Sequence, residues 1–195
     1  MFRLFANAWK VKDIRNKILY TFVILAIIRL GAHIALPGIS VAAVKAAQSA
    51  ESTGTLYNII AGGYNSRWSI FSMGIGPYIN ASIIMQLLTV AIPKLEQLAK
   101  EGEDGRKKIS SYTRYLTVAL AVIQAIGITL SYRTMFTSSS KLMLICSVLT
   151  LVSGSTFIMW LAEQITNKGI TNGSSMIIFV NIVSNLPTGI TSLIY

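Results

Sequence analysis

Five long apolar stretches dominate the pattern of hydrophobic and polar positions along the chain. They cover about residues 18–36, 70–92, 115–132, 142–162 and 176–195. Each is close to the length of about 20 mostly apolar residues that a membrane-spanning helix needs. The second and fifth stretches contain many polar residues, which a helix surrounded by lipid would not have. The pattern therefore predicts an all-α polytopic membrane protein with five transmembrane helices, two of which turn a polar face away from lipid.

The two polar helices carry stripes of the same kind at i, i+4, i+7 and i+11, the spacing that puts residues on one helix face. In the second helix these positions are Ile75, Ile79, Ser82 and Gln86. In the fifth helix they are Ser174, Ile178, Asn181 and Asn185. A shared aqueous cavity would explain both stripes, and a helix–helix seam would also explain them. In a wet path the isoleucines would form a constriction that excludes ions by dewetting.

Residues 37–69 form a long connection between the first two predicted helices. Within it Leu56, Ile59 and Ile60 have helical spacing, with Gly54 before them and two glycines after them. A helix over about 54–65 is too short to span a bilayer. It would either lie at the membrane interface or fold back as a re-entrant segment into a cavity lined by protein.

The basic residues fall mostly on one side of the predicted topology. Only 12% of residues are charged and the net charge is +10, whereas a soluble domain has about 25% charged residues. Twelve Lys and Arg residues lie on the side of the N-terminus and four on the other, which predicts a cytoplasmic N-terminus and a cytoplasmic loop at about 94–114. This loop contains Arg106, Lys107, Lys108 and Arg114. Solvation alone would explain its charge, but the loop could also attract anionic lipids or a cytosolic partner.

The first apolar stretch has the basic start of a signal peptide, but its apolar character continues to Leu36 and four further stretches follow. We therefore expect an uncleaved first helix. Arg29 lies inside it, and an arginine at the centre of a membrane helix costs at least about 2.5 kcal/mol. We expect its side chain to face protein or to extend toward an interface.

The residues that catalysis or metal binding would need are scarce. The chain has one histidine, His33, and one cysteine, Cys146, and no Asp or Glu near the middle of a predicted span. An intramembrane enzyme would need a nucleophile–base pair or metal ligands there, so we expect no enzyme, no metal site and no cofactor. A small-solute or ion transporter would carry charged or ion-coordinating groups at the midplane, whereas the stripes offer isoleucine, serine and asparagine.

Four continuous segments carry a resemblance to a known family: DIRNKI, SIFSMGIGPYINASIIMQLLTV, KEGEDGRKKISSYTRY and MWLAEQITNKGITNGSSMIIFVNIVSNLP. They resemble the SecY family, whose members form the central subunit of the Sec protein-translocation channel. These segments occur in the family's order and extend over most of the chain. The chain is thus identified as a member of this family, corresponding to its N-terminal half.

The resemblance implies a fold and a set of functional residues. Family members have ten spanning helices in two inverted-repeat halves, with an hourglass pore between the halves. The resemblance places residues 54–65 on the plug helix that closes the pore and Ile75, Ile79 and Ile178 on the apolar ring at its waist. It also implies a lateral gate, lined on this half by the second and third helices, through which membrane segments reach lipid.

The family's partners and length complete the expectation. The resemblance implies a cell (plasma) membrane location, SecE and SecG as small membrane subunits, and the motor ATPase SecA or a ribosome as the source of work. Signal sequences and unfolded secretory polypeptides would be the cargo. Family members are about twice as long as this chain, so we expect the pore to need the missing C-terminal half or a second copy.

Overall fold

The computed structural model describes residues 11–39, 68–133, 136 and 141–194, and only the backbone of 185–194. Within these ranges the regular elements are all helices: α2 (Lys12–Gly31), α6 (Gly76–Ala91), α7 (Pro93–Lys100), α8 (Glu103–Ser131), α9 (Lys141–Lys168) and α10 (Gly173–Ile194). The predicted all-α class is confirmed for this part of the chain. The predicted plug, with Leu56, Ile59 and Ile60, lies outside the described residues.

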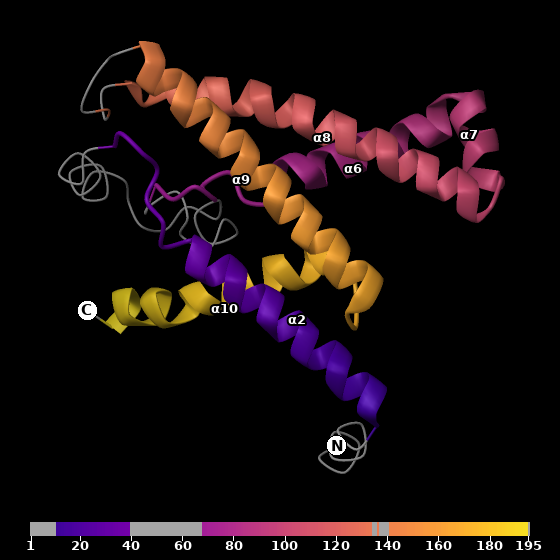
Figure 1. The fold of residues 1–195 in the computed structure, drawn as a ribbon, viewed down its shortest axis with the longest axis horizontal. Coiled ribbons are helices and arrows are strands. Elements are labelled where there is room, and N and C mark those ends of the chain that lie inside the picture. Colours follow the sequence, from indigo (N-terminus) through magenta and orange to yellow (C-terminus); the bar gives the residue numbers. More distant parts are fainter. Residues whose placement is uncertain (1–10, 40–67, 134–135, 137–140, 195) are drawn as a thin grey trace.

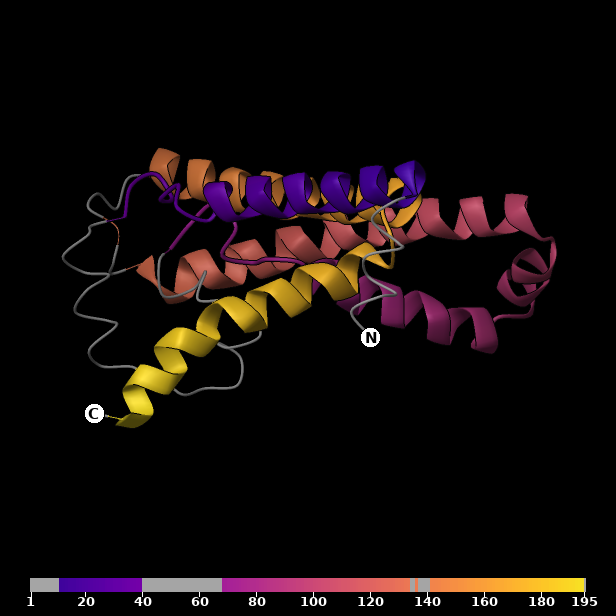
Figure 2. The ribbon, with the colours of Figure 1, turned by 90° about the horizontal axis from the view of Figure 1, so that it is seen from below.

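Helix α9 lies at the centre of the arrangement (Figure 1). It packs against α8, which runs beside α6 and α7, and it also packs against α2 and α10. In the view turned by 90°, α2 and α9 lie side by side and α10 runs diagonally away from them (Figure 2). Both views place the start of α2, helix α7, the start of α8 and the end of α9 toward one end of the molecule. The basic residues of these segments are therefore gathered at that end.

Two apolar clusters hold the helices together. The larger one, called the central cluster below, joins α2, α9, α10 and the segment that leads into α6. Its buried members are Ile24, Leu25, Ile28, Ala32, Phe71, Ile75, Ile158, Leu161, Ala162, Ile165 and Ile177. The smaller cluster lies between α8, α9 and the segments that flank them, and its buried members are Leu36, Met73, Ala121, Ala125 and Leu151. Of the residues predicted from the stripes, Ile75 belongs to the central cluster, and Ile79 and Ile178 pack against it.

The segment that leads into α6 is fixed by α2 on one side and α9 on the other. The backbone N–H of Ile70 donates to the carbonyl of Ile34 at 3.0 Å, just beyond α2. On the α9 side, Gly154 packs so closely that a Cβ there would meet the carbonyl oxygen of Ile70. A larger residue at position 154 would push this segment away, so the glycine sets where α6 begins.

By length and composition, two described helices can each cross a membrane: α8 and α9. The bent pair α6–α7 would make a third span, and α10 provides a shorter apolar helix over Gly173–Ser184. Helix α2 does not qualify because every 18-residue window within it contains Arg15, Lys17 and Arg29. The first predicted span, 18–36, is shifted in the structure because the helix begins within the basic segment and ends at Gly31. The prediction of five spans is therefore matched only in part.

The segment predicted as a cytoplasmic loop at 94–114 is largely helical. Helix α7 follows α6 after a bend of 101° at Pro93, and α8 begins at Glu103. Proline supports this start because its missing N–H is not needed in a first helical turn. Gly102, with φ of +80°, reverses the chain between α7 and α8. Composition alone suggested a solvated loop, because α7 is too polar to resemble a span and has no buried residue.

Candidate functional site

The three isoleucines predicted for the ring meet at the central cluster. Ile75 is a buried member with 5% of its surface exposed. Ile79 of α6 and Ile178 of α10 are half-buried and pack against the same cluster. Ile178 is about a hundred positions away from Ile75 and Ile79 in the sequence. The fold therefore brings together side chains that helical periodicity could assign only to separate stripes.

The start of α6 explains how two of these isoleucines are presented together. Gly74 has φ of +54°, which favours glycine, and it turns the chain into the helix. Ile75 is the N-cap residue and Pro77 lies in the first turn. The N–H of Ile79 donates to the carbonyl of Ile75 at 3.1 Å, which places the two side chains one helical turn apart.

The start of α10 is fastened to the end of α9. The N–H of Gly173 donates to the Thr166 hydroxyl at 2.9 Å, and a Cβ on Gly173 would meet the carbonyl oxygen of Ala162. The side-chain oxygen of Asn172 accepts from the N–H of Ser174 at 3.2 Å and caps the helix. Sequence analysis placed the start of this helix near 176, whereas it begins at Gly173. This anchoring fixes the turn that carries Ile178.

The polar positions of the two stripes have different surroundings. On α6, Ser82 is half-buried and Gln86 exposed, and the Gln86 amide donates to the Ser82 hydroxyl at 3.4 Å. On α10, Asn181 is buried with 3% of its surface exposed. The side chain of Asn185 lies outside the described residues. The α6 stripe thus opens outward from the central cluster, whereas the described part of the α10 stripe is partly enclosed by this chain itself.

A hollow of about 590 Å³ lies between the start of α6 and the end of α8. Its lining residues are Met73, Gly76, Ile79, Asn80, Gln124, Gly127, Ile128, Ser131 and Tyr132. Ile79 therefore lines this hollow and also packs against the central cluster. The lining combines apolar side chains with amide and hydroxyl groups and contains no charged side chain.

Arg29 faces protein, as one of the two sequence-based alternatives predicted. Its Nη2 atom donates to the carbonyl oxygen of Val180 on α10 at 3.2 Å. The side chain thereby links α2 to the helix that carries Ile178. A hydrogen-bonded guanidinium costs much less inside a helical bundle than one exposed to lipid.

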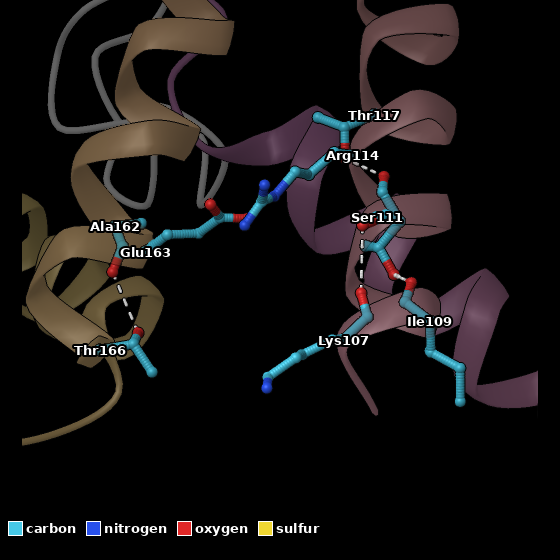
Figure 3. Close-up of polar contacts among 9 residues, drawn as sticks. Lys107, Ile109, Ser111, Arg114, Thr117, Ala162, Glu163 and Thr166 are labelled. Atoms are coloured by element: carbon cyan, nitrogen blue, oxygen red, sulfur yellow. Dashed lines mark hydrogen bonds and ion pairs between the residues drawn. The ribbon is translucent and has the colours of Figure 1, made fainter. Parts of the chain in front are cut away.

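The basic residues of the predicted cytoplasmic loop lie on the first turns of α8. Arg106, Lys107 and Lys108 are exposed, and the two lysines pair locally with Asp104 and Glu101. Arg114 behaves differently (Figure 3): its Nε donates to Oε1 of Glu163 on α9 at 2.8 Å. Among the described residues, this ion pair alone joins α8 to α9.

Sequence analysis did not single out Glu163. Its side chain is only 14% exposed, compared with 49% for Arg114, so the carboxylate depends on this partner. A signal was available, because Glu163 is the only acidic residue after Asp104 in the chain. A solitary acid at the end of a predicted span needs a basic partner, but the sequence does not say which of several nearby bases provides it.

No group of three or more His, Cys, Asp and Glu side chains within the described residues is placed to hold a metal ion. Arg29 and Arg114 instead make polar contacts between helices, to the Val180 carbonyl and to Glu163 respectively. What the arrangement offers is an apolar cluster shared by α6 and α10, with a hollow beside it and basic residues gathered at one end of the bundle. These features are typical of a helical membrane protein.

Comparison with known proteins gives the family. The family model described as SecY matches residues 69–195. Over 92% of this chain, the sequence is 48% identical to the protein translocase subunit SecY of Pseudomonas aeruginosa. Over 99% of this chain, it is 41% identical to the protein translocase subunit SecY of Streptomyces scabiei. The chain belongs to the SecY family. It spans about half the length of these relatives, 42% and 48% respectively.

Solved structures agree at the level of the fold. The chain resembles Sec61 in the canine ribosome–channel complex from the endoplasmic reticulum, with a TM-score of 0.62 and 19% sequence identity. The match covers 90% of this chain and 38% of Sec61. A structure described as a protein-conducting channel matches with the same score and coverage. The chain therefore has the fold of part of these two structures.

Proposed function

We propose that this chain is the N-terminal half of the pore-forming subunit of a Sec translocation channel. It would conduct unfolded secretory polypeptides across the membrane and release membrane segments sideways into lipid. The observation that carries the proposal is the meeting of Ile75, Ile79 and Ile178 at one cluster, beside a hollow that Ile79 also lines. Its relatives are named protein translocase subunits, which supports the same assignment.

The proposed mechanism needs no chemistry on the cargo. Branched apolar side chains at a narrow point dewet it and so resist ions, yet they present no fixed charge to a passing polypeptide. Ile75, Ile79 and Ile178 would supply this half of the ring, and Ser82, Gln86, Asn181 and Asn185 the polar surfaces next to it. The plug assignment of residues 54–65 remains a prediction from sequence, as does the gate between this half and its partner half.

The proposed topology has the N-terminus in the cytoplasm of a cell with its channel in the plasma membrane. It counts α2 and α10 as spans beside α6, α8 and α9. The gathering of the α2 start, α7 and the α9 end at one end of the bundle supports it, because their basic residues would then meet the cytoplasm together. That end would also face a motor ATPase such as SecA or a ribosome, while SecE-like and SecG-like subunits and the C-terminal half would complete the channel.

Replacing the three ring isoleucines by serine in the complete channel tests the proposal. Serine removes side-chain volume and makes the waist wettable, so ion conductance per channel in planar bilayers should rise. The matched control replaces three isoleucines exposed on the outside of this half, Ile83, Ile126 and Ile145, which are 50%, 45% and 56% exposed. An unchanged conductance in the ring variant, or an equal rise in the control, would count against the ring.

A further inference from the structure

We infer that Arg29 of α2 is a positioning residue for the constriction, acting through the backbone of α10. This inference rests on the proposed function, because it assigns a cause to the placement of Ile178. The direct observation is the hydrogen bond from Arg29 Nη2 to the Val180 carbonyl, two residues beyond Ile178. The contact joins helices that are 151 positions apart in the sequence.

The turn that carries Ile178 is held on one side by the contact of Gly173 with Thr166, whereas on the other side the backbone hydrogen bonding of α10 is weakened over the two turns after Val180. The Ser184 hydroxyl donates to the Asn181 carbonyl at 2.9 Å, in addition to the ordinary helical partner of that carbonyl. Pro187 lies within α10 and has no N–H, so the carbonyl of Val183 lacks its intrahelical donor. Extra donors and prolines are the usual causes of helix bending. Such a helix bends readily beyond Val180, so the hydrogen bond from Arg29 holds the second side of the turn that carries Ile178.

The side chain of Arg29 is suited to hold this turn in place. Helices α2 and α10 each pack mainly against α9 rather than against each other. Ile28, which precedes Arg29, is 2% exposed within the central cluster, and Ile177 of α10 is 1% exposed in the same cluster. Arg29 thus extends from the edge of the apolar contact to a polar point on α10. Apolar side chains can shift along one another at little cost. The hydrogen bond to the Val180 carbonyl, in contrast, is lost when α10 rotates or moves along its axis.

The charge of Arg29 makes the bond persistent. A guanidinium within a helical bundle has lost much of its water, so it gains more from a carbonyl acceptor than an exposed arginine would. This gain opposes movement of the turn that carries Ile178 away from Arg29.

The test uses the complete channel with three single replacements and measures ion conductance per channel. Arg29→Met keeps most of the length of the side chain but removes its donors. We expect the fraction of time in which a resting channel conducts ions to rise at least about tenfold, which corresponds to about 1.4 kcal/mol. Arg29→Lys retains a cationic donor and should restore most of the seal. Arg15→Met, an exposed arginine on the same helix, is the matched control and should leave the conductance unchanged.

Two further measurements separate positioning from a general loss of folding. In the background of the triple serine ring, Arg29→Met should add little leak, because the ring it positions has already been removed. Crosslinking between cysteines at positions 79 and 178 should decrease in Arg29→Met and recover in Arg29→Lys. A merely structural role would reduce the amount of channel without changing the conductance of each channel or this crosslink.

The outcomes are distinguishable from failure of the proposed function. If the serine ring leaks but Arg29→Met conducts like the parent channel and retains the 79–178 crosslink, the inference about Arg29 is overturned and the ring stands. If the serine ring itself does not leak, the proposed function fails. An additive leak of Arg29→Met on top of the serine ring would also overturn the inference.

Discussion

Replacing Gly154 by alanine should displace the segment that positions Ile75. A Cβ on Gly154 would meet the backbone carbonyl oxygen of Ile70, and its next neighbours are the carbonyl carbon of Ile70 and the ring of Phe71. Backbone atoms cannot move aside as the end of a flexible side chain can, so α9 and the segment before α6 must separate. Overpacking of this kind typically costs about 1–3 kcal/mol.

Gly127 of α8 provides a matched control for this change. It is also a glycine inside a long helix, but a Cβ there would meet no atom within 4 Å. Both substitutions gain about 0.5–1 kcal/mol from the better helix propensity of alanine. The difference between them therefore isolates the contact with Ile70, and Gly154→Ala should be less stable than Gly127→Ala by about 1–3 kcal/mol.

The assay is unfolding of the complete channel in detergent, with the free energy of unfolding compared between the two variants. Gly127→Ala should match or slightly exceed the parent protein, and Gly154→Ala should fall below it. Equal stabilities for the two variants would refute the reasoning, because they would mean that α9 does not set the position of the segment before α6.

Three other predictions concern the ion pair, the α10 cap and the topology. Arg114→Met should destabilise the channel by about 1–3 kcal/mol because it leaves the enclosed Glu163 carboxylate without its partner. Glu163→Gln should cost less than about 1 kcal/mol because the half-exposed Arg114 guanidinium can reach water. Comparing the unfolding free energies of the two variants tests this difference. Asn172→Ala should cost about 0.5–2 kcal/mol by loss of the helix cap, and the neighbouring exposed Thr171→Ala should be close to neutral in the same measurement. Cysteines introduced at 106–108 should resist a membrane-impermeant reagent added outside intact cells, and their labelling from outside would contradict the topology.

The stripe positions of the isoleucines proposed to form the ring could be predicted from sequence because helical periodicity is local. Ile75 and Ile79 are four residues apart, and Ile178 occupies the matching position in a second stripe. Periodicity could not predict that α6 and α10 present these faces to a common cluster. The relative placement of the two helices depends on close contacts such as that of Gly173 with the Ala162 carbonyl. Nothing in the sequence distinguishes this glycine from the others in the chain.

Helix α7 and the first turns of α8 were predicted as a loop for a physical reason. Hydropathy identifies segments that avoid water, and α7 has no buried residue, so its helical structure leaves little trace in an apolar pattern. The usable signals were Pro93, which favours a first helical turn, and Gly102, which allows the reversal before α8. The Arg114–Glu163 ion pair escaped prediction because 49 positions separate the two residues and several other basic residues are available nearby.

The first helix ends earlier than its apolar pattern predicts. Its apolar residues continue beyond Gly31, which led to a predicted span at 18–36, but the structure ends the helix there and turns the chain into a backbone contact with Ser69. This contact lies between segments far apart in the sequence. The partner of Arg29 could not be predicted for the same reason. The cost of an isolated charge left two alternatives, a side chain that faces protein or one that extends toward an interface, and the structure shows the first.

Photocrosslinking from the proposed ring to a polypeptide stalled during translocation tests the central claim most directly. A photoreactive residue at position 178 of the complete channel should crosslink to the translocating chain in high yield. The same residue at position 149, where Leu149 is 62% exposed on the outside of α9, should not crosslink to it. Equal crosslinking from both positions, or none from position 178 while export proceeds, would contradict the assignment of a pore beside the central cluster.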